Sequence, residues 1–123
     1  MIEYKDGIFY KNARKTYLVS KTLSTFKIKY PSGKLVAEFK LKKSLFGKST
    51  AILGNLKIEK EKNAPIADAK IVNRNINLIE NDGNIALIRG RDFLANFDFD
   101  KNTLDIYEDE GLCVVIFTAL KNL

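Results

Sequence analysis

The residue types that most often carry out catalysis are scarce in this chain of 123 residues. It contains no histidine, which removes the commonest general base and the commonest metal ligand. Its single cysteine, Cys113, lies in an apolar run and has no partner for an internal disulfide, so we expect a buried thiol and a reducing compartment. No phosphate-binding loop or dinucleotide fingerprint is present. We therefore expect a protein that is not an enzyme and uses no cofactor.

Acidic side chains gather in the C-terminal third, where Asp98 is predicted to face Asp105 across a hairpin. Opposed like charges destabilise a strand pair unless something neutralises them. Asp98, Asp100 and Asn102 also match three positions of a calcium-binding loop, but the glycine and the closing glutamate of that loop are missing. We expect a solvated hairpin face and assign no metal site. The weak alternative is a cation bound by Asp98, Asp100, Asn102, Asp105 and Asp109.

Lysines mark the N-terminal half as a surface for an anionic partner. Residues 1–62 hold 15 Lys or Arg against 5 Asp or Glu, whereas residues 63–123 hold 6 against 10. Several lysines near an anionic membrane can each add about 1 kcal/mol to binding, so phospholipid headgroups are the first ligand we expect. Nucleic acid is disfavoured because exposed aromatic residues do not alternate with these lysines. The expected binding residues are Lys27, Lys29, Lys40, Lys42, Lys43 and Lys48.

Two other interpretations of the charge pattern stay open. The lysines can simply keep the outer faces of strands soluble and block edge-to-edge pairing. Alternatively, the chain is a protein–protein interaction module of the inhibitor or immunity type. In that case the acidic C-terminal half, with its cluster from Asp98 to Glu110, forms the contact surface.

Alternating apolar and polar residues predict the strands that position these side chains. The first hairpin joins 26–30 to 35–42 through a turn at 31–34, and its register places Phe26 opposite Phe39 and Lys27 opposite Glu38. One face of this hairpin is therefore apolar and the other carries the lysines. Other strands are predicted in 2–10 with a turn at Asp6-Gly7, and in 16–20, 50–53, 56–60 and 70–73.

Two further hairpins follow in the C-terminal half. The segments 76–80 and 85–88 flank Asp82-Gly83, a dipeptide suited to the positive φ angles of a type I′ turn. The segments 93–99 and 104–106 form the third hairpin, with Phe93, Ala95, Phe97 and Phe99 on one face. We count about ten strands, more than one open sheet commonly holds, and therefore predict a mainly β domain: a closed or nearly closed antiparallel barrel.

The run from Leu112 to Leu120 is apolar on every side, so periodicity alone does not separate a buried helix from a buried strand. Its β-branched residues favour a strand, whereas Asp109 and Glu110 before it and Lys121 after it favour a helix. We predict a helix inside the barrel, with a two-sheet sandwich as the fallback if the segment is a strand. The run is about half of the ~20 residues that a membrane-spanning helix needs, and the N-terminus lacks the layout of a secretory signal. We expect a single cytoplasmic domain, 1–123, with no transmembrane segment.

Hairpins with polar-glycine turns, the corner at 42–46 and the acid-led apolar final segment together resemble the tubby C-terminal-like superfamily, which includes LURP-one-related proteins and phospholipid scramblases. The resemblance covers nearly the whole chain and implies a closed twelve-stranded barrel around a central hydrophobic helix. The chain is shorter than usual for this superfamily, which implies missing strands near 64–69. Phosphoinositide binding and lipid-associated roles occur in the superfamily, so a lipid ligand is what the resemblance implies.

Overall fold

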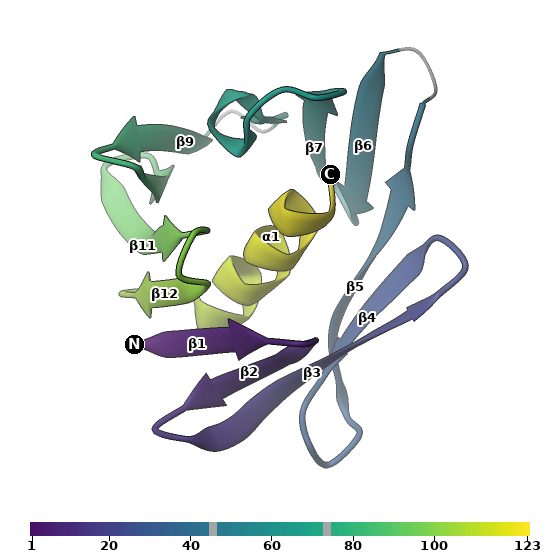
Figure 1. Cartoon of the computed structure of the whole chain (residues 1–123), viewed down its shortest axis with the longest axis vertical. Coiled ribbons are helices and arrows are strands. Elements are labelled where there is room, and N and C mark those ends of the chain that lie inside the picture. Colours follow the sequence, from purple (N-terminus) through teal and green to yellow (C-terminus); the bar gives the residue numbers. More distant parts are fainter. Residues whose placement is uncertain (45–46, 73–74) are drawn as a thin grey trace.

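The structure, a computed structural model, describes residues 1–44, 47–72 and 75–123. Within these ranges twelve strands form one antiparallel sheet in the order β8-β7-β6-β5-β4-β3-β2-β1-β12-β11-β10-β9. The sheet curls around a single helix, α1 (Glu110–Asn122), and brings its two end strands towards each other (Figure 1). Because no ladder joins β8 to β9, the barrel is nearly closed rather than closed.

Most connections between neighbouring strands are short hairpin turns, so chain order and spatial order largely coincide. The segments predicted as strands all contain an observed strand, although our total of about ten falls below the observed twelve. The last predicted residue of 70–73 lies outside the described residues. The strands are β1 (Ile2–Lys5), β2 (Ile8–Lys11), β3 (Arg14–Thr22), β4 (Thr25–Lys29), β5 (Leu35–Lys42), β6 (Lys48–Leu53), β7 (Leu56–Glu61), β8 (Lys70–Ile71), β9 (Ile76–Asn81), β10 (Asn84–Arg89), β11 (Asp92–Asp98) and β12 (Thr103–Ile106).

The predicted register of the first hairpin is confirmed: Phe26 faces Phe39 and Lys27 faces Glu38. The two phenylalanine rings stack inside the barrel with centroids 4.8 Å apart. The type I′ turn at Asp82-Gly83 is also confirmed, because both residues have positive φ angles, 50° and 83°. These turns connect adjacent antiparallel strands and keep the apolar residues of each strand on the inner face.

The third hairpin differs from its prediction in two ways. A β-bulge between Leu87 and Ile88 of β10 and their partners on β11 lets Leu94 point inwards and turns Phe93 out, where it is 60% exposed. The register is also shifted, so Asp98 faces Thr103 and not Asp105. The reason lies in the turn, because the Asp98 carboxylate accepts hydrogen bonds from the N–H groups of Asp100 and Lys101.

The apolar C-terminal segment forms the central helix, and the sandwich fallback is therefore wrong. Eight consecutive residues, Cys113 to Leu120, are buried on all sides by the sheet. A segment in the middle of a barrel has no strand edge to pair with, so only a helix satisfies its own backbone hydrogen bonds there. Rings of Tyr4, Phe9, Phe97 and Phe99 surround Phe117 at centroid distances of 4.7–5.9 Å.

The family resemblance drew attention to two segments, 64–69 and 42–46. The stretch 64–69 contains a short 3₁₀ helix, η1 (Ile66–Asp68), before β8 begins at Lys70. The described residues nevertheless form twelve strands, so the implied loss of strands is wrong. The corner at 42–46 begins at the end of β5, but Leu45 and Phe46 lie outside the described residues.

Candidate basic binding surface

The consecutive strands β3, β4 and β5 carry seven cationic side chains and one carboxylate. Three cations lie on β3, two on β4 and two on β5, and Glu38 is the one acidic residue. None of the seven cations forms an ion pair within the described part of the chain. This set, called the basic face below for the charge of its three strands, consists of Arg14, Lys15, Lys21, Lys27, Lys29, Lys40 and Lys42. Lys27 and Lys40 point outwards, whereas Lys21 pairs with Phe26 and lies on the inner side at the end of the hairpin.

Four of the six lysines predicted as binding residues belong to the basic face. Lys27 and Lys40 are exposed on the outer side of the first hairpin, and Lys42 follows Lys40 two residues later on the same side. Lys29 is partly buried at the far end of β4. Although Lys27 lies opposite Glu38, no ion pair joins the two side chains, so the ammonium group of Lys27 is not neutralised by this carboxylate. Lys43 is exposed just after β5, where it lines a pocket with Lys60 and Lys62.

Lys48, the sixth predicted residue, lies on β6 and is ion-paired. Its Nζ atom lies 3.6 Å from Oε2 of Glu59, and Nζ of Lys57 lies 3.0 Å from Oε1 of the same carboxylate. The hydrogen bond from Lys57 holds the pKa of Glu59 below its ordinary value. These two lysines share one carboxylate on the β6–β7 part of the sheet. The positive charge of Lys48 is therefore partly compensated, unlike that of the cations of the basic face.

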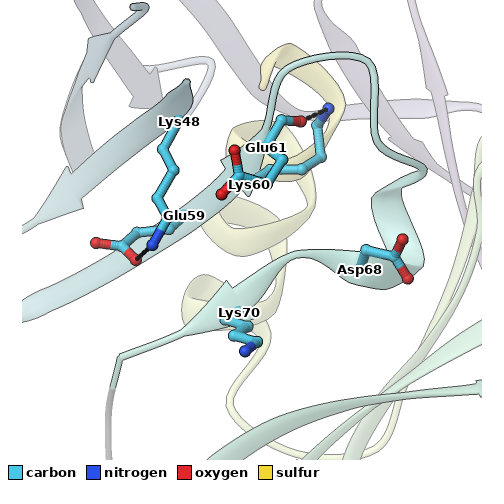
Figure 2. A pocket seen from close by; sticks show the side chains of 6 residues that line it. All are labelled: Lys48, Glu59, Lys60, Glu61, Asp68 and Lys70. Carbon is cyan, nitrogen blue, oxygen red and sulfur yellow. Dashed lines mark hydrogen bonds and ion pairs between the residues drawn. The ribbon is translucent and has the colours of Figure 1, made fainter. Parts of the chain in front are cut away.

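A small pocket of about 110 Å³ next to Lys48 is balanced in charge (Figure 2). Its lysine Lys60 is almost fully buried, and the ammonium group donates hydrogen bonds to the carbonyl oxygens of Glu61 at 3.2 Å and Ala64 at 2.9 Å. These bonds tie the end of β7 to the loop that follows it, a structural role. The six residues around the pocket are three lysines and three acids: Lys48, Lys60, Lys70, Glu59, Glu61 and Asp68.

Sequence reasoning missed the cations of β3. The predicted strand 16–20 ended short of Lys15 and Lys21, whereas β3 is nine residues long. Arg14 and Lys15 line an open depression of about 750 Å³ with Lys11 and Tyr30. At the other end of the strand, Nζ of Lys21 lies 5.4 Å from the centre of the Phe26 ring. The lysines on both sides of the apolar residues 17–19 were the available signal. A predicted strand extended to include them would have found the cations of β3.

Three of the five residues considered for a cation, Asp98, Asn102 and Asp109, are engaged by other groups of the chain. Oδ1 of Asn102 accepts a hydrogen bond from Nζ of Lys121 at 2.6 Å, and Oδ2 of Asp109 accepts one from Nη1 of Arg89 at 2.8 Å. The carboxylate of Asp98 accepts the two backbone hydrogen bonds of the β11–β12 turn. Among the described residues, no group of three or more Cys, Asp or Glu side chains is arranged to hold a metal ion.

The helix start is held by long-range ion pairs. Asp109 occupies the expected N-cap position, but its backbone is left-handed, with φ 56°, and its side chain binds Arg89 and no helix N–H. Nη2 of Arg89 also lies 3.5 Å from Oε1 of Glu108. In the first turn, Glu110 accepts hydrogen bonds from Nζ of Lys11 at 2.7 Å and from the hydroxyl of Tyr17. The acids at the end of the Asp98–Glu110 cluster therefore stabilise the contact between helix and sheet.

The single thiol is placed for packing. Cys113 is completely buried, and its Sγ atom donates to the carbonyl oxygen of Glu108 at 3.3 Å. Burial away from water raises the pKa of Cys113 to about 12. The thiol is therefore protonated at neutral pH, which makes it a poor nucleophile.

Comparisons with protein-family models, with curated proteins and with solved structures find no match for this chain. In the described part of the chain, no helix is both long enough and apolar enough to span a bilayer.

Proposed function

We propose that this chain is a non-enzymatic binding domain that attaches to anionic phospholipid headgroups through the basic face of β3, β4 and β5. The observation that carries the proposal is the excess of seven cations over one carboxylate on three adjacent strands, with none of the seven in an ion pair among the described residues. Unpaired surface charge of one sign costs self-repulsion in the free protein. An anionic surface relieves that repulsion.

The magnitude of the attraction is sufficient for reversible membrane binding. Each Lys or Arg near an anionic bilayer contributes about 1 kcal/mol, provided that it lies within a Debye length of about 10 Å at 0.1 M salt. Lys27, Lys40 and Lys42 lie on adjacent strands about 5 Å apart, so they can approach one bilayer together. The cytoplasmic leaflet, which is rich in anionic lipid, is the surface we propose.

We also propose that the domain is of tubby-like type. A sheet of twelve antiparallel strands around one apolar C-terminal helix supports this kinship, because it is the architecture that the resemblance implies. Fold alone does not define a ligand, since one fold can host many functions. The lipid proposal therefore depends on the basic face and not on kinship.

The decisive experiment is cosedimentation with vesicles of phosphatidylcholine, with and without phosphatidylserine, at low and high salt. The wild-type protein should pellet only with the anionic vesicles, and less at high salt. The triple variant Lys27→Glu, Lys40→Glu and Lys42→Glu should lose this binding. A matched control, Lys5→Glu, Lys70→Glu and Lys101→Glu, makes the same change in net charge at exposed lysines outside the basic face and should bind much better. If wild type does not pellet with anionic vesicles at low salt, the proposal fails.

The protein–protein alternative is less favoured by the geometry. It required the acidic residues between Asp98 and Glu110 to be free for a partner. Glu108 and Asp109 are paired with Arg89, and Glu110 is paired with Lys11. A partner would have to compete with these internal contacts, whereas an anionic ligand meets no such competition on the basic face.

A further inference from the structure

An exposed leucine lies at the tip of the hairpin that joins β3 to β4. Thr22 and Thr25 form the last pair of this hairpin, and Leu23 and Ser24 form its two-residue turn. Leu23 is 91% exposed, the largest exposed fraction among the large apolar residues of the described chain. The turn lies at the right edge of the molecule, pointing away from α1 (Figure 1).

The backbone at this tip is unusual for leucine. Leu23 has φ 56°, in the left-handed region that residues with a Cβ atom seldom adopt. Apart from Ala13, the other left-handed positions among the described residues are asparagine, aspartate or glycine, as at Asp6, Asn12 and Asp82. A polar residue or glycine would suit this turn better, so neither backbone geometry nor packing explains the leucine.

The tip belongs to the basic face. Lys40 lies directly opposite Thr25, and the N–H of Leu41 donates to the carbonyl oxygen of Ser24 at 2.8 Å, which holds the turn against β5. Lys21 lies two residues before Leu23, and Lys42 two residues beyond Lys40. An apolar side chain is therefore presented to solvent among three cations that form no ion pair in the described chain.

An apolar tip with lysines on both sides of the hairpin end matches the layering of an anionic bilayer. Lysine ammonium groups bind at the level of the headgroups, while an apolar side chain between them reaches the acyl boundary. A free phosphate or a nucleic acid offers charge to the lysines but no apolar phase to the leucine. The arrangement consequently favours a membrane over those other anions.

We infer that Leu23 is the membrane anchor of this domain: it inserts below the headgroups of an anionic bilayer while Lys21, Lys40 and Lys42 bind the headgroups. This inference rests on the proposed function and adds an orientation to it. The β3–β4 tip points into the bilayer, and the opposite end of the hairpin stays in water.

The absence of tryptophan from the sequence makes a direct test possible. Leu23→Trp introduces a single tryptophan at the tip, where its emission can be excited apart from the tyrosines. Leu35→Trp is the matched control, because Leu35 is also exposed, at 47%, but pairs with Lys29 at the opposite end of the hairpin. Each variant is titrated with phosphatidylserine-containing vesicles, with the same vesicles carrying brominated acyl chains, and with duplex DNA. Pelleting is measured in parallel.

Insertion predicts a blue shift and bromine quenching for Leu23→Trp with anionic vesicles, and neither effect for Leu35→Trp. DNA should produce no blue shift in either variant. In the wild-type protein without tryptophan, Leu23→Asn should weaken vesicle binding about tenfold, whereas Leu35→Asn should leave vesicle binding unchanged. If Leu23→Trp pellets with vesicles but keeps a solvent-exposed emission, the anchor is wrong and headgroup binding stands. If nothing pellets, both the anchor and the proposed function fail.

Discussion

The hydroxyl of Tyr17, on β3, donates a hydrogen bond of 2.5 Å to the carboxylate of Glu110, in the first turn of α1. The ammonium group of Lys11 binds the other oxygen of the same carboxylate at 2.7 Å. Two neighbouring strands of the sheet thereby hold the start of the central helix. This contact is partly buried, and we expect it to contribute to the pH dependence of stability.

Acid should weaken the fold through Glu110. Burial raises the pKa of Glu110, but the hydrogen bonds from Lys11 and Tyr17 outweigh burial and hold it below the ordinary glutamate value. A carboxyl with a lowered folded-state pKa stabilises the fold above its unfolded pKa of about 4.3, and this stability is lost as pH falls through the folded-state value.

Glu110→Gln should therefore lower the free energy of unfolding at pH 7 by about 1 kcal/mol and make its acid dependence shallower. Urea unfolding at a series of pH values measures both effects. Tyr17→Phe should show the same trend more weakly, since Lys11 remains. Tyr107→Phe, at an exposed tyrosine, is the control and should follow wild type. If the free energy of unfolding of Glu110→Gln falls at acid pH as steeply as that of wild type, this contact does not govern the pH dependence.

Phe117 should be among the most costly side chains to truncate. It is completely buried and its ring contacts four other aromatic rings, including a stacked contact with Phe99 at 4.7 Å. Phe117→Ala should cost about 3 to 5 kcal/mol, measured as a lower urea midpoint. Phe93→Ala removes the same atoms from an exposed site and should cost about 0.5 kcal/mol or less. Equal costs at the two sites would contradict the central position of the helix.

A chain ending at Glu108 should not fold. It lacks the central helix, whose buried Val114, Ile116, Phe117 and Leu120 each contribute about 1.5 to 3 kcal/mol by removal from water. The inner face of the sheet would then be exposed, and we expect loss of the native circular dichroism spectrum together with aggregation. A soluble, native-like product would contradict the view that the helix organises the core.

Cys113 should not react with thiol reagents in the folded protein. Burial raises its pKa to about 12, so almost no thiolate exists at pH 8, and the sheet blocks access to the sulfur atom. A colorimetric disulfide reagent should modify the protein at the rate of unfolding, and at once after denaturation in urea. Rapid modification under native conditions would mean that the helix leaves the barrel readily.

Leu23→Asn should stabilise the free protein, whereas we expect it to weaken the proposed membrane binding. Asparagine tolerates the left-handed backbone of this turn better than leucine, so a gain on the order of 1 kcal/mol in the free energy of unfolding is expected. Thermal unfolding without lipid measures it. Leu35→Asn, at a strand position, should give no gain. A lower melting temperature for Leu23→Asn would show that leucine has a structural role in the turn.

Several parts of this architecture were accessible from the sequence because they depend on local patterns. Alternation with a period of two defines which face of a strand is buried, and Phe26 facing Phe39 followed directly from it. Asp82-Gly83 identified its turn through the backbone preference of the two residues. The lysines between the apolar residues of the first hairpin identified most of the outer face now assigned to lipid.

Other features depend on contacts between distant residues and left no local signal. The bulge that exposes Phe93 and buries Leu94 reverses the alternation by one residue. The carboxylate of Glu110 is neutralised by Lys11, 99 residues earlier in the chain, and Asp109 by Arg89. Because those partners meet only after the barrel has curled around the helix, the acidic cluster looked available in the sequence and is not.

The sequence by itself determined the hairpins, the inward faces and the presence of a fully apolar tail, since each follows from residue type and spacing within a few positions. Only the tertiary structure decided that the tail is a helix, because a segment enclosed by strands must satisfy its own backbone hydrogen bonds. It also decided which charges remain unpaired, because curvature of the sheet brings some cations to carboxylates and leaves the lysines around Leu23 facing water.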